Sequence, residues 1–360
     1  MSHYEERLEN DLENIRGEVS DLANRVKDAV KNSVHALLTN NQDLASATIL
    51  GDGPINRKMR EIDTLCHRFI AVHLPSAGHL RLMSSVIRIN IILERIGDYA
   101  VTISRELQRI NGAPDKRLAQ GIELLSNEVQ LMLSQSVASF DEENAELARA
   151  TIAMSAQIDN TVSGLYEELL DEQAQWSLLE RFAVFSAYHR LERIADQAKN
   201  LCEQTIFTVS GEGKGSKVYE VLFIDDDNSC LSQLAEAVAR KHFPDSGIYT
   251  SVAGGEPAQS ISSGLSEFMD SHGMDASSAE PKTLEVTPAE LNRFHIIVSL
   301  AKPVSAYIGR VPFQTTALNW KLASVPADCA CSEQDYEGIH RELSVLIKDL
   351  MTVLRGEGAV

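Results

Sequence analysis

Apolar residues recur at helical spacing through roughly the first 208 residues, a region with few Gly and Pro and many Ala, Leu, Glu and Arg. A period near 3.6 residues predicts amphipathic helices, and clusters of turn-forming residues mark the breaks between them. Long helices joined by short connections form antiparallel bundles. This half is therefore predicted to be all-α, with helices over 4–38, 42–73, 76–111, 115–139, 142–173 and 176–208.

One helical stretch occurs twice. Residues 93–98 read Leu-Glu-Arg-Ile-Gly-Asp, and residues 191–196 read Leu-Glu-Arg-Ile-Ala-Asp. The copies are 98 positions apart (192 − 94 = 98), so the repeat divides the six helices into three plus three. We expect two three-helix units, over residues 1–112 and 113–209.

Each copy places two carboxylates side by side, because residues at i and i+4 share a helix face. An apolar seam beside the first pair predicts that these acids are half-buried, where an unpaired carboxylate is costly. The second helix of each unit adds one more acid. Three carboxylates from two helices are typical of metal sites in bundles. The candidate ligands are Glu94, Asp98 and Asp52 in the first unit, and Glu192, Asp196 and Asp159 in the second.

Two other interpretations of these acids remain open. Most Glu/Asp pairs at helical spacing form only a solvated helix face. Alternatively, Arg95 and Arg193 neutralise the acids of a neighbouring helix.

The pattern changes after the Gly/Ser-rich segment 210–216, which is predicted to be a linker. Short apolar runs at 218–224, 249–252, 295–300 and 315–318 alternate with helical patterns, and a last helix is expected near 335–354. Such alternation predicts a four-stranded parallel sheet covered by helices, here an α/β domain over 217–360. Functional sites of these sheets lie at the carboxyl ends of the strands, so the site of this domain is predicted in the loop 225–232.

The net charge of −19 over 360 residues argues against binding nucleic acid or an anionic membrane. No apolar run approaches the roughly 20 residues that span a bilayer, and the first residues do not resemble a signal peptide. A cytoplasmic protein is expected. The odd, scattered cysteines suit a reducing compartment and are predicted to be structural thiols; they are Cys66, Cys202, Cys230, Cys329 and Cys331.

The helical half resembles the PhoU family of phosphate-transport regulators. Residues 93–100 look like the family's E-x-x-x-D signature, and Glu192 with Asp196 looks like its second copy. Residues 74–81 are similar to its Q-P-x-A-x-D-L-R turn, with His79 where the family usually has Asp.

The resemblance implies two three-helix bundles, homodimers, and iron, zinc or another divalent cation at the E-x-x-x-D motifs. It also implies that the protein damps phosphate-starvation signalling through a phosphate importer and a sensor kinase. Asn56 and Ser163 occupy places where acids are common in the family, which lowers the expected affinity for a hard cation.

Residues 218–355 resemble the low-molecular-weight protein tyrosine phosphatases and the related arsenate reductases. Their first strand ends in V-L-F-V-C-x-G-N-x-C-R-S, and the corresponding loop keeps the polar framework but not the catalytic residues. By this resemblance an Asp replaces the nucleophilic Cys, a second Asp replaces the Gly, and a Leu replaces the Arg that clamps phosphoryl oxygens. Ser324-Val325 stands where the family has its Asp-Pro general acid. The degenerate loop comprises Asp225, Asp227, Asn228, Cys230, Leu231 and Ser232.

These replacements remove nucleophile, clamp and acid together. A phosphate cradle presents amide dipoles and a guanidinium to a dianion, and three adjacent carboxylates repel that dianion. No phosphatase or arsenate reductase activity is therefore predicted, and the domain is expected to serve interaction or sensing.

Several alternatives stay open for the acidic loop and for the whole chain. The loop could bind a cation, as the acidic start of a response-regulator receiver does, or it could be a solvated loop that caps the next helix. The chain could be an enzyme that uses Asp225 as the nucleophile of a metal-assisted phosphoryl transfer, or a purely structural adaptor.

Overall fold

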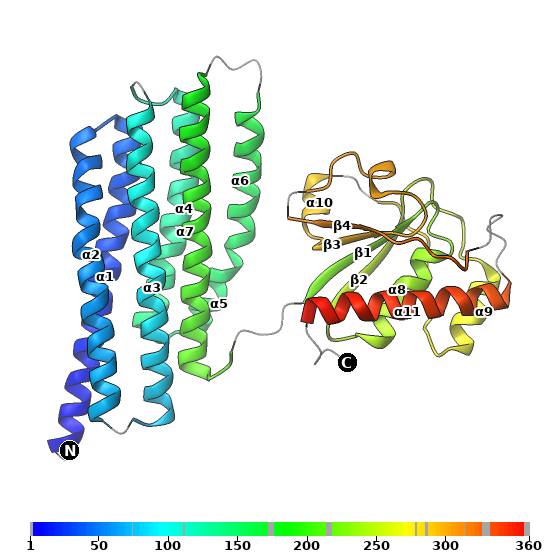
Figure 1. Cartoon of the computed structure of the whole chain (residues 1–360), viewed down its shortest axis with the longest axis horizontal. Helices are drawn as coiled ribbons and strands as arrows, with labels where there is room; N and C mark the ends of the chain where they lie inside the picture. Colours follow the sequence, from blue (N-terminus) through cyan, green and yellow to red (C-terminus); the bar gives the residue numbers. More distant parts are fainter. Residues whose placement is uncertain are drawn as a thin grey trace. The chain divides into compact units, whose positions relative to one another are not determined.

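The computed structural model describes residues 3–73, 75–110, 112–171, 176–213, 218–277, 279–284, 287–312, 314–325 and 332–355. The chain divides into two compact units, Met1–Lys214 and Gly215–Val360 (Figure 1). Cys329 and Cys331, predicted to be structural thiols, lie outside the described residues.

The first unit is a bundle of long helices. Its centre is the pair α3 and α7, with α1 and α2 packed against α3 and with α4, α5 and α6 packed against α7 (Figure 1). The two halves of the bundle therefore follow the sequence repeat. The helices are α1 (His3–Thr39), α2 (Gln42–Val72), α3 (Ala77–Glu106), α4 (Lys116–Asp141), α5 (Ala145–Ala153), α6 (Ser155–Leu169) and α7 (Leu178–Ser210), with a 3-10 turn at Leu107–Arg109.

Local signals set where these helices begin and end. Asn41 and Ser76 accept backbone N–H bonds at the starts of α2 and α3, which satisfies donors that the helix itself leaves open. Ser177 and Glu180 form a capping box at the start of α7. Gly211, at φ 76°, ends α7 in a left-handed conformation that glycine adopts without strain.

The apolar seam predicted along α3 is confirmed, because every one of its members is buried. These side chains fill the space between α3 and its neighbours, and each Val, Ile or Leu among them contributes about 1.5–3 kcal/mol of transfer free energy. The seam therefore fixes which face of α3 turns inward and which face carries the acids. Its members are Val86, Ile89, Leu93, Ile96, Ala100, Ile103 and Leu107.

The single helix predicted over 142–173 is wrong, because α5 ends at Ala153 and α6 begins at Ser155. At the break the N–H of Met154 bonds to the carbonyl of Thr151, three residues back, and the Ser155 hydroxyl donates to the carbonyl of Ile152. A serine hydroxyl that takes a helix carbonyl competes with the regular backbone ladder. The regular apolar period hides such a break.

The second unit confirms the predicted four-stranded parallel sheet. Its order is β2-β1-β3-β4, so β1 lies between two neighbours. In Figure 1, α8 and α11 lie on one side of the sheet and α10 on the other. The strands are β1 (Tyr219–Asp225), β2 (Gly247–Ala253), β3 (Ile296–Ser299) and β4 (Thr316–Asn319); the helices are α8 (Leu231–His242), α9 (Ser263–Ser271), α10 (Pro288–Asn292) and α11 (Glu333–Arg355), with a 3-10 turn at Val304–Ala306.

Strand β1 is buried on both faces, as expected of a central parallel strand. Val221 and Phe223 pack with α8 and α11, whereas Leu222 and Ile224 pack with residues near α10 on the other face. This double burial places the last residue of the strand, Asp225, inside the domain. In the described part of the chain, no helix is long and apolar enough to cross a membrane.

Candidate functional site

The first copy of the repeated motif brings three carboxylates together from two helices. Asp52 lies on α2, and Glu94 and Asp98 lie on α3. Burial raises the pKa of Glu94, and the charges of Asp98 and Asp52 raise it further; burial and the charge of Asp52 raise the pKa of Asp98. Glu94 is half-buried as predicted, whereas Asp98 is exposed. The three acids therefore repel one another across the α2–α3 contact.

These acids have few partners of their own. One carboxylate oxygen of Asp52 accepts a hydrogen bond from the Asn56 amide at 2.8 Å, and its other oxygen is buried without a partner. Among the described residues, neither Glu94 nor Asp98 has a side-chain hydrogen bond or an ion pair. The charges of Arg95 and Arg105 oppose the rise in these pKa values only in part, because the pKa of both Glu94 and Asp98 stays raised.

The second copy has the same layout but its acids on α7 are partnered. Glu192 Oε2 accepts a hydrogen bond from the Tyr166 hydroxyl at 3.3 Å and lies 3.2 Å from His189 Nδ1. Arg193 donates to Asp196 at 3.0 Å, so this arginine neutralises an acid of its own helix and not of a neighbouring one. Burial raises the pKa of Asp159 on α6, and the charges of Asp196 and Glu192 add to the rise.

The six predicted ligands therefore gather as two sets of three. Within the described residues, however, no three His, Cys, Asp or Glu side chains lie close enough together to hold one metal ion. Helical spacing predicted which helix faces carry the acids but not the distances between the carboxylates.

The acidic loop after β1 is built differently, because its first carboxylate is buried. Asp225 is 4% exposed, and its two oxygens accept the backbone N–H groups of Asn228 at 2.7 Å and of Ser232 at 2.9 Å. Burial raises the pKa of Asp225, and the two N–H bonds oppose that rise. The expected solvated loop is thus wrong for Asp225. The expected capping is confirmed, because Ser232 lies in the first turn of α8.

The next two acids point outward and have other partners. Asp226 forms an ion pair with Lys302 at 2.7 Å and accepts a hydrogen bond from the Tyr307 hydroxyl at 2.7 Å. Burial alone would raise the pKa of Asp226, but these two contacts hold it below its ordinary value. Asp227 accepts the N–H and the hydroxyl of Ser229, which closes a local turn.

Asn228 holds the loop in shape from inside. It is fully buried with φ 56°, a left-handed conformation that Asn tolerates better than most residues. Its amide donates to the Ser232 hydroxyl, and its carbonyl oxygen accepts from the Gln233 side chain and from the Lys282 N–H. Leu231 and Cys230, the other residues of the degenerate loop, pack at the edge of the core on the α8 side.

The loop is also tied to the chain that follows β2. The N–H groups of Gly254 and Gly255 donate to the carbonyls of Asp225 and Asp226. The Tyr307 ring lies so close to Gly254 that an added Cβ would come within 2.0 Å of it. A residue with a side chain at position 254 would therefore push away the tyrosine that bonds Asp226.

Sequence reasoning missed Gln233, Lys302 and Tyr307 as parts of this site. Gln233 follows the predicted loop directly, and a polar residue in the first turn of a helix was a usable signal. Lys302 and Tyr307 follow β3, and no local pattern connects them with the acidic loop.

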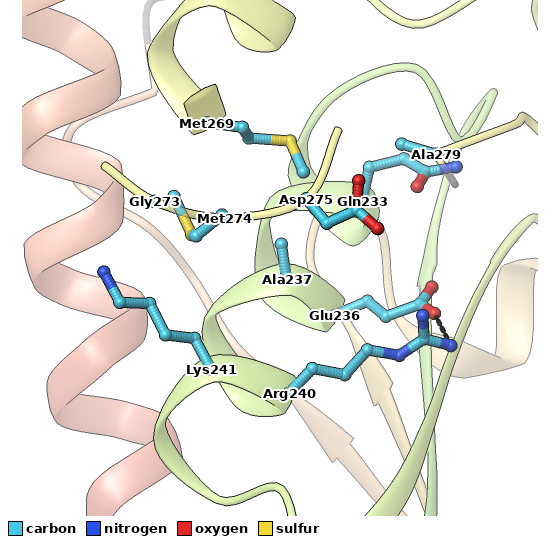
Figure 2. Close-up of a pocket in the computed structure, with 10 residues that line it drawn as sticks. All are labelled: Gln233, Glu236, Ala237, Arg240, Lys241, Met269, Gly273, Met274, Asp275 and Ala279. Atoms are coloured by element: carbon cyan, nitrogen blue, oxygen red, sulfur yellow. Dashed lines mark ion pairs between the residues drawn. The ribbon is translucent and has the colours of Figure 1, made fainter. Parts of the chain in front are cut away.

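A shallow hollow of about 260 Å³ lies beside α8, on the side of α9 (Figure 2). Figure 2 shows Glu236 paired with Arg240 on its α8 wall, with Met269 of α9 across from them. Gln233 lines the hollow and also bonds Asn228, so the hollow borders the loop framework.

The helical unit is similar to known proteins over most of its length. The PhoU domain model matches residues 19–107 and 122–205. A phosphate-specific transport system accessory protein PhoU homolog from Pseudomonas aeruginosa is 30% identical over 216 residues, which cover 58% of this chain and 88% of that protein. The chain belongs to the PhoU family. A PhoU homolog from Aquifex aeolicus is 32% identical over 183 residues, covering 51% of this PhoU-family chain and 81% of that protein.

The fold of the helical unit agrees with this assignment. The crystal structure of PhoU from Pseudomonas aeruginosa matches with a TM-score of 0.53 and 28% identity, over 57% of this chain and 99% of that chain. The low molecular weight phosphotyrosine protein phosphatase model matches residues 220–327. Both predicted resemblances are confirmed: a PhoU-family bundle is joined in one chain to a phosphatase-like domain.

Proposed function

We propose that this PhoU-family protein is an accessory regulator of a phosphate transport system, and that it restrains phosphate-starvation signalling through the importer and a sensor kinase. The observation that carries the proposal is the match of the helical unit to 88% of a PhoU homolog, with both acidic motifs present. We also expect a homodimer, which sedimentation equilibrium tests.

A gene deletion tests the regulatory role. Deletion in the host should switch on a phosphate-starvation reporter in phosphate-rich medium, and the full-length gene should switch it off again. Reporter activity and phosphate uptake that stay unchanged after deletion would contradict the proposal.

The first copy of the acidic motif is proposed to bind iron, zinc or another divalent cation. The donor chemistry suits a cation, because Asp52 has a buried oxygen without a partner and the pKa values of Glu94 and Asp98 are raised. As placed, the three carboxylates do not form a three-ligand site, so binding one ion requires their side chains to move closer together. Carboxylate oxygens are the donors that hard cations prefer. When bound, a divalent cation would offset two of the three negative charges. A cation at the second copy would first have to displace the bonds that Tyr166 and Arg193 make to the acids of α7.

The second copy of the motif provides a matched control for this proposal. Glu94→Gln/Asp98→Asn should lose most of the metal that copurifies with the wild type, as measured by elemental analysis. The matched variant Glu192→Gln/Asp196→Asn removes the same two charges and should lose less. Equal metal content in wild type and both variants would end the proposal.

The phosphatase-like domain is proposed to be catalytically inactive and to serve interaction or sensing. Asp225 stands where the nucleophile belongs, yet it is buried and both of its oxygens accept backbone N–H bonds. A nucleophile needs an accessible, activated atom, so this geometry also disfavours Asp225 as a phosphoryl acceptor. Leu231 offers no charge to a phosphoryl group.

Activity assays test this loss of chemistry. The full chain should turn over neither an aryl phosphate nor arsenate above the level seen with Asp225→Ala. Turnover that the Asp225→Ala substitution abolishes would overturn the assignment.

A further inference from the structure

The loop after β1 places two backbone N–H donors around one buried carboxylate, and we call this pair of donors the ring. The N–H groups of Asn228 and Ser232 point at the two oxygens of Asp225, at 2.7 and 2.9 Å. Ser232 belongs to the first turn of α8, where the helix dipole favours negative charge. The ring thus has the donor arrangement of an anion site, and a side chain of the same loop fills it.

Other hydrogen bonds hold the loop that carries these donors. Asn228 is buried and fixes both ends of the loop, through the Ser232 hydroxyl on one side and the Lys282 N–H on the other. A buried N–H without an acceptor costs about 1–3 kcal/mol. If the Asp225 carboxylate were removed, the two N–H groups would be left without an acceptor and would be available to another one.

We propose that the Asp225 carboxylate acts as a built-in ligand that occupies the ring in place of a tetrahedral oxyanion such as inorganic phosphate. This inference deepens the proposed loss of catalysis, because it says what closes the site. The loop lacks a nucleophile, and in addition its two N–H donors are already bonded to Asp225.

Occupied donors explain the closure better than general repulsion does. The charge of Asp226 is balanced by Lys302 and by the Tyr307 hydroxyl, and Asp227 is engaged by Ser229. Among the described acids, only Asp225 contacts the donors of the ring. Removing Asp225 should therefore open the ring, whereas removing the neighbouring charge should not.

Two variants of the full chain separate these causes, because each removes one negative charge. Asp225→Ala frees both N–H groups, and Asp226→Asn leaves them bonded to Asp225. Calorimetric titration with inorganic phosphate at neutral pH should show binding to Asp225→Ala at least about tenfold tighter than to wild type or to Asp226→Asn, a difference of roughly 1.4 kcal/mol. Equal gains in the two variants, or no gain in Asp225→Ala, would overturn the inference.

A measurement on the wild type keeps the inference testable even if Asp225→Ala folds poorly. The amide proton signals of Asn228 and Ser232 should shift together as the Asp225 carboxyl titrates, and millimolar phosphate should leave them unchanged. Amide signals that ignore this titration, or that move with phosphate, would refute it. Neither result bears on the regulatory role, which the deletion experiment tests separately.

Discussion

The acids on α3 and the acids after β1 differ in what balances their charge. Glu94 and Asp98 have no side-chain partner among the described residues, and repulsion between carboxylates raises the pKa of Glu94 on top of the effect of burial. After β1, Asp225 has two N–H donors and Asp226 has an ammonium and a hydroxyl. Unbalanced acids gain from an external cation, whereas a satisfied loop gains nothing from an external ion.

The two copies of the repeat show the same contrast within one fold. Corresponding positions carry the same residues, Glu94 with Glu192 and Asp98 with Asp196, yet within the described residues only the two acids on α7 have side-chain partners. Part of the difference comes from a neighbouring helix, because Tyr166 supplies a hydroxyl to Glu192 from α6. The rest lies within α7, where Arg193 pairs with Asp196. Identical motifs therefore predict different chemistry once their surroundings are known.

The largest effect is expected at the buried carboxylate. Asp225→Ala leaves two buried N–H groups without acceptors, so it should lower the free energy of unfolding of the second unit by about 2–4 kcal/mol. Urea denaturation can follow Trp320, whose ring lies near Phe223, in a Trp176→Phe background. The control Asp227→Ala removes an exposed acid and should cost less than about 1 kcal/mol. Equal losses in the two variants would contradict the assigned role of Asp225.

A pH dependence of intermediate size should follow from the same group. Burial raises the pKa of Asp225 in the folded protein, so between the ordinary carboxyl pKa and the raised one the folded state keeps a proton that the unfolded state has lost. Asp225 should thus reduce the stability of the second unit as the pH rises through this window, by at most about 1.4 kcal/mol per pH unit.

The same denaturation assay, repeated across this pH range, measures that slope. Asp225→Asn cannot titrate and should lack the Asp225 contribution. Parallel pH profiles of wild type and Asp225→Asn would show that the pKa of Asp225 is not raised.

The smallest effect should distinguish the two copies in metal-free protein. Glu94→Gln/Asp98→Asn removes unbalanced like charges and should raise the stability of the first unit by about 0.5 kcal/mol or less. Glu192→Gln/Asp196→Asn loses the ion pair with Arg193 and should lower it by a similar amount. Thermal unfolding after treatment with a chelator compares the stabilities of the two double variants. Stability changes of the same sign in both would contradict the proposed difference between the copies.

Much of the fold could be predicted because it depends on local patterns. The apolar seam of α3 and the four apolar runs of the sheet repeat at the periods of helix and strand, so they predict the element and its buried face. The break at Met154 could not be predicted, because the apolar period continues through it. Which residues of the acidic loop have partners was equally inaccessible, since Asp226 and Lys302 are 76 positions apart (302 − 226 = 76).

The sequence by itself determined the two units, the duplicated acidic motif and the acidic loop after β1. Only the tertiary structure decided that Asp225 is buried against its own loop. It also decided that the acids of α7 have partners, whereas those of α3 have none in the part of the chain that the structure describes. The physical reason is that periodicity specifies which face of an element turns inward, whereas the charge balance of a carboxylate depends on the detailed geometry around it. That geometry includes the shape of its own loop, as at Asp225, and donors from distant positions, as Lys302 is for Asp226.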